Sequence, residues 1–263
     1  MARKRLDVEL VRRHLARSRE QAQEFIEAGQ VEVNGLVATK AATQVDENAA
    51  VRILVDSSDD YVSRGAHKLI GALDTFGLSV EDKVVLDAGA STGGFSDVLL
   101  RRGAAHIHCV DVGYGQLAWK ISTDERTTVL DRTNIRYLKP EDIGGAVDLI
   151  VADLSFISLE TVLPALVSVL KQDGDALLMV KPQFEVGKEA LGPGGVVTES
   201  SQRVDSVNKI ANKAFELGLG MAGVVASPLP GPSGNVEYFL WLNRSAPAPD
   251  FSAITKAVEE GPQ

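Results

Sequence analysis

Apolar residues recur along most of this 263-residue chain in short blocks, separated by stretches of helical spacing. Seven blocks have the length and composition of buried strands: 84–88, 107–112, 127–130, 147–153, 176–181, 221–227 and 236–243. Helical apolar spacing fills most of the gaps, notably over 64–76, 94–102, 159–171 and 201–217. Because apolar strands that alternate with helices form parallel sheets covered on both faces, the pattern predicts an α/β domain over residues 64–244.

The last two predicted strands have no helix between them. They are joined only by the sequence PLPGPSGN, residues 228–235. A connection this short pairs consecutive strands in opposite directions. We therefore expect a mostly parallel sheet with an antiparallel last strand, the final hairpin lying at the sheet's edge.

Residues 1–58 follow another pattern, which predicts a small α+β domain. Helical spacing covers 7–15 and 18–29. Asn34-Gly35 then separates two alternating runs, a strong hairpin signal because both residues tolerate positive φ. The first twenty residues hold seven basic and three acidic side chains, on a chain whose formal net charge is −9. A basic end on an acidic body suits contact with a polyanion, and a solvated charged helix is the alternative.

The remaining segments are an acidic linker at 59–63 and a C-terminal extension at 245–263, which is expected to end in a short helix. No apolar run approaches the roughly 18 to 20 residues of a membrane-spanning helix. The start of the chain lacks the apolar stretch of a secretory signal. Together with the single cysteine, this favours a cytoplasmic protein without a disulfide framework and without a membrane partner.

The pair His106 and His108, next to Cys109, could suggest a metal site. Strand alternation places both histidines on one face and the cysteine on the other. A shared ion is then geometrically poor, so we interpret the three as packing residues and expect no metal.

A glycine turn, DAGASTGG at 87–94, follows the first strand of the α/β domain. It is not a phosphate loop, because Phe95 stands where such a loop needs its lysine, and Ser91 replaces the second glycine of a dinucleotide turn. A ligand without phosphates, such as S-adenosylmethionine, does not need the close backbone approach that the second glycine allows a pyrophosphate. Asp111 ends the next strand, where an acid accepts hydrogen bonds from ribose hydroxyls. A dinucleotide is the alternative ligand.

The turn resembles the first motif of Rossmann-like methyltransferases. That resemblance implies that Asp87 lies near the methionine part of S-adenosylmethionine, and that Gly89 and Gly93 allow close approach. The predicted cofactor-binding residues are Asp87, Gly89, Ser91, Gly93, Asp111 and Val112.

Four charged residues are candidates for catalysis: Lys68, Asp153, Lys181 and Glu237. Asp153 and Lys181 each close a predicted parallel strand, at the edge where open α/β sheets bind ligands. Two lysines placed together disfavour each other's ammonium form, so one of them could act as a base, and we assign that role to Lys181. Taken singly, each residue could instead be an ordinary surface charge.

Two family resemblances support this interpretation. The segment RLDVELVRRHLARSREQAQEFIEAGQVEVNG resembles the alpha-L RNA-binding module, and the Lys-Asp-Lys-Glu order resembles the tetrad of FtsJ-type ribose 2′-O-methyltransferases. With SRGAHKL, LDAGASTGGFSDVLL, DVGYGQL, ADLSFISL, MVKPQFEVGK and PSGNVEYFLWL, the chain resembles the TlyA family of bacterial ribosomal-RNA cytidine 2′-O-methyltransferases. The resemblance implies a Rossmann-like methyltransferase domain behind an RNA-binding domain, S-adenosylmethionine as cofactor, and ribosomal RNA of both subunits as substrate.

The residues expected to contact RNA phosphates are Arg3, Arg5, Arg17, Arg19, Lys40, Arg132, Arg136 and Lys188. Phe156 is expected either to stack on an extruded base or to be a core aromatic. The acidic linker departs from the basic-aromatic stretch of the family, which leaves any coupling role of the linker in doubt. We expect a monomer. The rival functions are a membrane-active haemolysin, a label the family has also carried, and a non-catalytic ribosome-binding factor.

Overall fold

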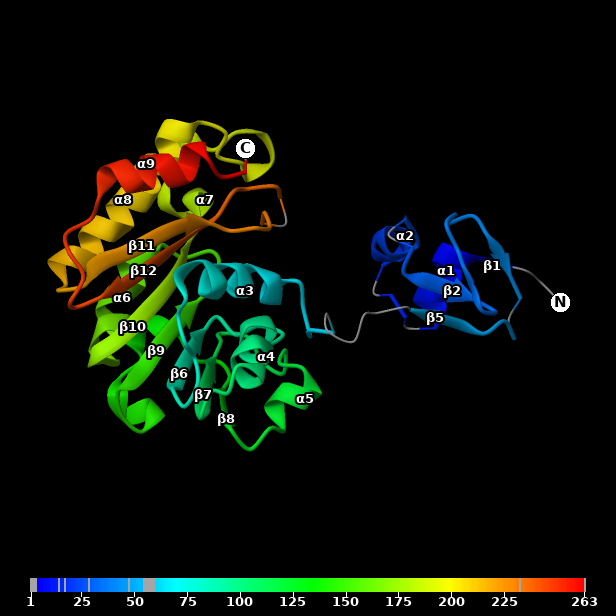
Figure 1. Ribbon diagram of the computed structural model, residues 1–263, viewed down its shortest axis with the longest axis horizontal. Coiled ribbons are helices and arrows are strands. Elements are labelled where there is room, and N and C mark those ends of the chain that lie inside the picture. The colour runs from blue at the N-terminus through cyan, green and yellow to red at the C-terminus, as the bar shows by residue number, and fades with distance from the viewer. Residues whose placement is uncertain are drawn as a thin grey trace. The chain divides into compact units, whose positions relative to one another are not determined.

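The computed structural model describes residues 4–13, 15–16, 18–27, 29–46, 48–53, 60–231 and 233–262, and of Lys188 only the backbone. The chain divides into two compact units, Met1–Asp60 and Tyr61–Gln263 (Figure 1). Among the described residues, no helix combines the length and the apolar character needed to span a bilayer.

In its described residues, the first unit contains two helices and short antiparallel strands. Its elements are β1 (Lys4–Arg5), α1 (Leu6–Arg12), α2 (Arg19–Glu27), β2 (Val31–Val33), β3 (Leu36–Val37), β4 (Gln44–Val45) and β5 (Val51–Ile53). The predicted hairpin is confirmed: Asn34 and Gly35 both have positive φ between β2 and β3. The buried faces of α1 and α2 supply Leu6, Leu10 and Ile26 to a small core. The pairing of β1 with β4 was not predicted.

The second unit is built on a seven-stranded sheet in the order β11-β12-β10-β9-β6-β7-β8. The strands are β6 (Val84–Ala88), β7 (His106–Val110), β8 (Thr127–Leu130), β9 (Val147–Ala152), β10 (Leu170–Val180), β11 (Gly220–Ala226) and β12 (Tyr238–Asn243). Strand β12 runs antiparallel to both of its neighbours, and the other adjacent pairs are parallel. The predicted parallel sheet with an antiparallel last strand and an edge hairpin is confirmed.

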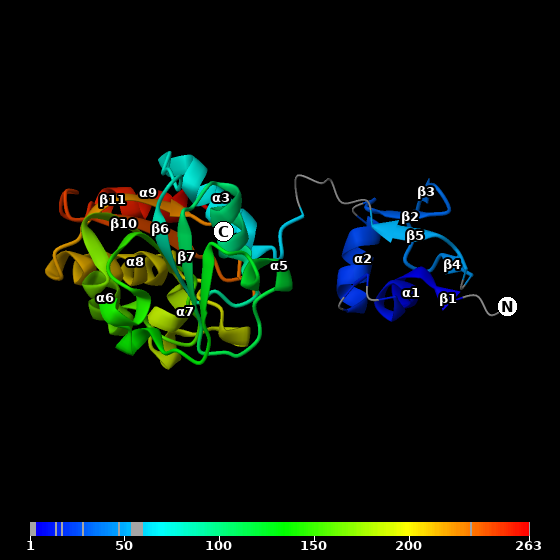
Figure 2. The same cartoon turned by 90° about the horizontal axis from the view of Figure 1, so that it is seen from below.

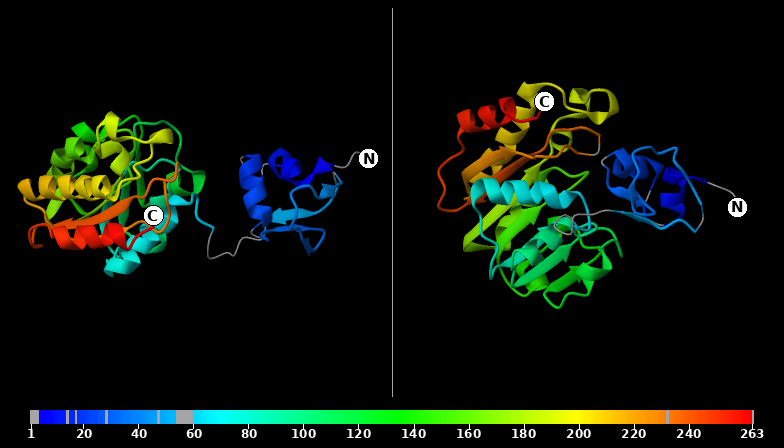
Figure 3. Two further views of the ribbon diagram at one scale, coloured as in Figure 1. Left: turned by 90° about the horizontal axis from the view of Figure 1, so that it is seen from above. Right: turned by 45° about the vertical axis from the view of Figure 1, so that its right-hand side comes forward.

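Helices cover both faces of this sheet (Figure 2). They are α3 (Gly65–Phe76), α4 (Gly94–Arg101), α5 (Trp119–Ser122), α6 (Leu159–Ser168), α7 (Pro182–Glu185), α8 (Ser200–Glu216) and α9 (Phe251–Glu259). Apolar residues of α3, α4 and α5 form one core with the sheet, and those of α6, α8 and α9 form the other. Helix α9, the predicted helix of the C-terminal extension, packs beside α8 and β11 (Figure 3).

The predicted boundary between α6 and β10 is wrong by several residues, whereas the other strand bounds differ by at most two. The pattern extends a helix to residue 171, but α6 ends at Ser168 and β10 begins at Leu170. Leu170 pairs with Val147 on β9, and a register shift follows before Asp175. Because residues 171–175 are polar apart from a glycine, the apolar pattern of the strand becomes visible only from residue 176.

Candidate active site

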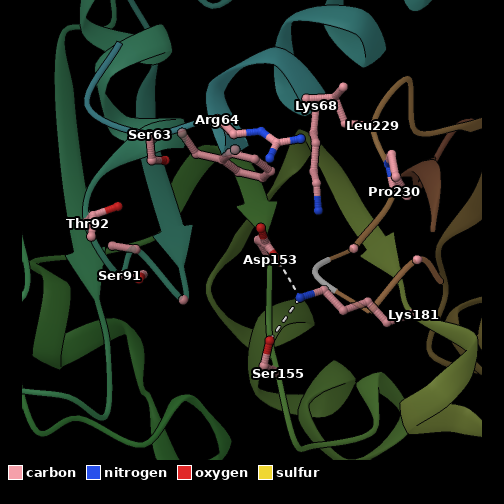
Figure 4. Close-up of a pocket in the computed structure, with 17 residues that line it drawn as sticks. Ser63, Arg64, Lys68, Ser91, Thr92, Asp153, Ser155, Lys181, Leu229 and Pro230 are labelled. Carbon is pink, nitrogen blue, oxygen red and sulfur yellow. Dashed lines mark hydrogen bonds and ion pairs between the residues drawn. The ribbon is translucent and has the colours of Figure 1, made fainter. Parts of the chain in front are cut away.

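The carboxyl ends of β6, β9 and β10 meet at one edge of the sheet, where they border a cavity of about 610 Å³. Its wall comprises the start of α3, the turn after β6, the ends of β9 and β10, and the loop between β11 and β12. Lys68 extends from α3 and Lys181 from the end of β10 into this cavity (Figure 4). The sheet therefore brings together predicted residues that are far apart in the sequence.

The four candidate catalytic residues form two ion pairs. The Lys181 Nζ atom lies 2.5 Å from Asp153 Oδ1 and donates a hydrogen bond of 2.9 Å to Ser155 Oγ. The Lys68 Nζ atom lies 2.6 Å from Glu237 Oε2. Lys68, Lys181 and Glu237 are buried, whereas Asp153 is partly accessible. Buried lysines need such partners, since an unpaired charge removed from water costs several kcal/mol.

A second cavity of about 540 Å³ adjoins the first and shares Gly89, Ser91, Asp153 and Ser155 with it. Its wall includes Asp111 and Val112 after β7, and the loop after β9. The Asp111 carboxylate accepts hydrogen bonds from the backbone N–H groups of Ser91, at 2.9 Å, and Gly113, at 2.7 Å. It thus fixes the glycine turn to the next strand end.

The glycine turn has three residues in the left-handed region, with φ of 86° at Gly89, 48° at Ser91 and 92° at Gly93. A Cβ at Gly89 would lie 2.6 Å from the Asp153 carbonyl oxygen, closer than atoms can pack. Glycine is therefore required here because the loop after β9 approaches it, and a ligand is not needed to explain it. Gly93 borders neither cavity, and its Cβ would meet the side chain of Leu117.

Asp87 also borders neither cavity, because it lies completely buried beneath the turn. Its Oδ2 atom accepts a hydrogen bond of 2.6 Å from Ser96 Oγ on α4, and its Oδ1 atom has no partner in the described part of the chain. Burial raises the pKa of the Asp87 carboxyl to about 7, and the nearby charges of Asp153 and Asp111 act in the same direction. This geometry indicates that Asp87 stabilises the glycine turn and does not contact a ligand.

The nearby His106 and His108 have ring centroids 4.8 Å apart, and Cys109 is buried in the core on the α3 side. Burial lowers the pKa of His108. No cluster of three or more potential metal ligands occurs within the residues that the structure describes.

Aromatic and basic side chains lie on the segments that line the second cavity or within two residues of its lining residues. The Arg132 guanidinium stacks 4.3 Å from the ring centroid of Tyr114, and Arg136 lies 5.7 Å from that of Tyr137. Phe156 borders the cavity with 92% of its surface exposed, so the alternative of a core aromatic is wrong. These residues form an exposed surface of the kind that RNA can contact.

The candidate RNA contacts of the first unit are partly held in place. Asp7, fully buried on α1, accepts hydrogen bonds of 3.0 Å from both Arg5 and Arg19. Lys40 is exposed. Arg3 and Arg17, and the side chain of Lys188, lie outside the described residues.

Several residues of the first cavity were not anticipated from the sequence. Ser63 and Arg64 precede α3, Ser155 follows Asp153, and Leu229 and Pro230 lie in the β11–β12 loop. Ser155 could have been predicted from the sequence, since it lies two residues after Asp153, the acid at the end of β9. Ser63 and Arg64 lie in the family motif SRGAHKL but were not singled out, and nothing in the sequence pattern indicated Leu229 and Pro230.

Comparison with known proteins agrees with this architecture. Residues 61–244 match the FtsJ-like methyltransferase family and residues 4–51 match the S4 domain. The chain is 58% identical to "16S/23S rRNA (cytidine-2'-O)-methyltransferase TlyA" of Mycobacterium tuberculosis over 268 aligned residues, covering 100% of both chains. It is 35% identical to "Hemolysin A" of Brachyspira hyodysenteriae, covering 84% of this chain and 92% of that protein.

Among solved structures, a putative hemolysin from Streptococcus thermophilus superposes with a TM-score of 0.78. The two are 38% identical, and the match covers 99% of this chain and 96% of the other. The chain therefore belongs to the TlyA family of FtsJ-like methyltransferases.

Proposed function

We propose that this protein transfers a methyl group from S-adenosylmethionine to the ribose 2′-hydroxyl of cytidine in ribosomal RNA. The observation that carries the proposal is the pairing of Lys181 with Asp153, and of Lys68 with Glu237, beside a cavity that adjoins a second, cofactor-sized one. The name of the Mycobacterium tuberculosis relative, which is 58% identical, describes this reaction for that protein and supports it here.

The second cavity fits an adenosine-containing cofactor. Asp111 uses one lone pair of each carboxylate oxygen on backbone N–H groups, which leaves the others to accept from ribose hydroxyls. Val112, 68% exposed, offers an apolar surface for a base. When bound, S-adenosylmethionine supplies a methyl group on a positively charged sulfur. Asp87 and Gly93 would contribute only by supporting the turn.

We propose that Lys181 accepts the proton of the ribose 2′-hydroxyl. Asp153 and Ser155 fix its Nζ atom at the cavity wall. As the 2′-oxygen bonds to the methyl carbon and the carbon–sulfur bond breaks, the 2′-hydroxyl proton would pass to the Lys181 amine, which requires that Lys181 first give up a proton to Asp153 or to solvent. Lys68, fixed by Glu237, would orient the ribose from the α3 side.

Binding of the RNA would use both units. Arg5, Arg19 and Lys40, with Arg3 and Arg17, are proposed phosphate contacts of the S4 domain. Arg132, Arg136 and Lys188 are proposed to hold phosphates near the reaction site, with Phe156 stacked on the extruded cytosine. The same site would act on RNA of both ribosomal subunits.

The haemolysin names of some relatives do not favour a different function here. Lysis of a membrane makes no use of two lysines that border a cavity and are each paired with a carboxylate, whereas methyl transfer to a hydroxyl needs an oriented acceptor and a group that takes up the proton.

Transfer of a labelled methyl group from S-adenosylmethionine to isolated small and large ribosomal subunits tests the proposal. Resistance of the 3′ phosphodiester to alkaline cleavage locates the modified ribose. We expect label on a cytidine 2′-oxygen. Label on a base would overturn the assigned roles of the lysines, and absence of label on either subunit and on free RNA would favour the non-catalytic binding factor.

A further inference from the structure

The ends of β9 and β10 carry Asp153 and Lys181 of the proposed reaction site. Beyond this ion pair, other contacts connect the segments that follow the two strands. We call residues 153–158, between β9 and α6, the β9 loop, and residues 181–185, which begin at the end of β10, the α7 segment. The Phe156 ring of the β9 loop lies 5.3 Å from that of Phe184 in the α7 segment. Beyond it, two hydrogen bonds from the start of α6 reach Glu185.

Glu185 is a buried carboxylate whose two oxygens are both used. The Ser158 hydroxyl donates to Oε2 at 2.5 Å, and the Leu159 backbone N–H donates to Oε1 at 2.8 Å. Burial raises the pKa of the Glu185 carboxyl, and these two hydrogen bonds oppose the increase.

A helix cap alone does not account for this arrangement. Ser158 is already the N-cap of α6, since its Oγ atom accepts from the Glu160 N–H at 3.2 Å. Glu185 adds a connection of a different kind, because it comes from the end of the neighbouring strand. It thereby joins the far end of the β9 loop to the segment that carries Lys181.

The β9 loop needs such a constraint. Phe156 has φ of 63° and an almost fully exposed ring, so it gains little from core burial while adopting a conformation that bulky residues disfavour. Strained residues persist only where the surroundings determine their conformation. Here the start of the loop is fixed because Asp153 and Ser155 both contact the Lys181 Nζ atom. Its end is fixed by the hydrogen bond between Ser158 and Glu185.

We propose that Glu185 is a positioning residue that holds the β9 loop against the α7 segment, so that Phe156 is presented to the nucleobase of the target nucleotide. The inference rests on the proposed function. Glu185 itself borders neither cavity, so its effect on the reaction passes through the loop.

The test is a double-mutant cycle between Glu185→Ala and Phe156→Ala, measured as kcat/KM for methylation of ribosomal subunits well below the melting temperature of each variant. A small misplacement of a substrate-positioning group can cost up to about 100-fold, and we expect Glu185→Ala to lose between about tenfold and 100-fold. In the Phe156→Ala background the same change should cost less than about threefold, since coupled residues are not additive. Glu185→Gln should restore most of the activity, because its amide can accept from Leu159 and donate to Ser158.

Asp250→Ala is the matched control. Asp250 caps α9, away from both cavities, by accepting from the N–H groups of Ser252 and Ala253. It should lower the melting temperature and leave kcat/KM unchanged. If Glu185→Ala does not fold, Ser158→Ala enters the same cycle. It removes the hydroxyl donor to Glu185 together with the N-cap acceptor for the Glu160 N–H, and keeps the Leu159–Glu185 hydrogen bond. We expect a smaller loss that also vanishes without Phe156.

Methylation by Glu185→Ala within twofold of wild type, or losses that multiply independently of Phe156, would overturn the positioning role. Absence of ribose methylation by the wild-type protein in the same assay would instead contradict the proposed function, so the two failures are distinguishable.

Discussion

Lys68 and Glu237, which are 169 residues apart in the sequence, form a buried ion pair with 2.6 Å between Nζ and Oε2. The pair joins α3, the first helix of the methyltransferase unit, to the residue preceding its last strand, β12. The β11–β12 hairpin therefore has a functional consequence, because it brings a buried carboxylate to Lys68, which borders the first cavity.

Removal of that carboxylate should affect stability as well as activity. Glu237→Ala leaves the Lys68 ammonium buried without its partner, a change that typically costs about 3–5 kcal/mol. Urea denaturation monitored by circular dichroism gives the free energy of unfolding. The control is Glu216→Ala, which breaks the exposed pair with Lys213 on α8 and should cost less than about 1 kcal/mol. If the two substitutions lowered the free energy of unfolding equally, the buried pair would contribute no more to stability than the exposed one.

Asp87 should make the protein less stable as the pH rises. Burial raises the pKa of this carboxyl to about 7 in the folded state, from an ordinary value of 3.8. Between these pH values the folded state binds more protons than the unfolded state, so the free energy of unfolding decreases with pH and levels off above pH 7. Asp87→Asn removes this contribution.

Asp87→Asn should therefore be more stable than wild type at pH 8, by on the order of 1–4 kcal/mol, with a difference that shrinks as the pH approaches 4. Thermal or urea unfolding at several pH values measures it. Asp74→Asn, at an exposed site on α3, is the control and should show no such trend. A difference that is constant with pH would mean that Asp87 is ionised in the folded protein throughout.

In the S4 domain, Asp7 positions two arginines that we expect to contact RNA. Hydrogen bonds from Arg5, followed by those from Arg19 and Gln23, outweigh the effect of burial and hold the pKa of the Asp7 carboxyl well below its usual range. The side chain of Arg19 is nevertheless largely accessible. One carboxylate between two guanidinium groups leaves a net positive charge at the surface.

Arg19→Ala should weaken binding to ribosomal RNA and reduce the slope of log K against log salt concentration by about 1, the value expected for one lost phosphate contact. Filter binding over a range of salt concentrations provides the slope. Arg52→Ala is the matched control in the same unit, since Arg52 is exposed and paired with Glu32 at 2.6 Å. An unchanged slope for Arg19→Ala would remove Arg19 from the RNA interface.

The sequence predicted the sheet well because its signal is periodic and local. Strands β6 and β8 have the predicted bounds, and the short loop 228–235 indicated the antiparallel strand. The start of β10 was missed because polar residues 171–175 hide it, and α7 because four residues after a strand give no helical periodicity.

For the candidate site, the sequence indicated which charged residues lie at strand ends, but not how they pair. It could not show that Asp87 is buried away from both cavities. Asp87 lies within β6, level with the buried Cys109 of β7, whereas Asp111 follows the end of β7 and borders the second cavity. Glu185 was overlooked for a similar reason: its partners Ser158 and Leu159 are more than 25 residues away in sequence, and only the parallel pairing of β9 with β10 brings them together.

The proposed mechanism is tested most directly by single-turnover methylation of ribosomal subunits with Lys181→Ala, together with the affinity of this variant for the same subunits. Lys171→Ala is the control, because Lys171 also pairs with an aspartate, Asp148 at 2.7 Å, but from the opposite end of β10. We predict that Lys181→Ala binds the subunits nearly as well as wild type and forms no 2′-O-methylcytidine, whereas Lys171→Ala forms it normally. Comparable turnover by Lys181→Ala and wild type would contradict the role assigned to this lysine and, with it, the proposed mechanism.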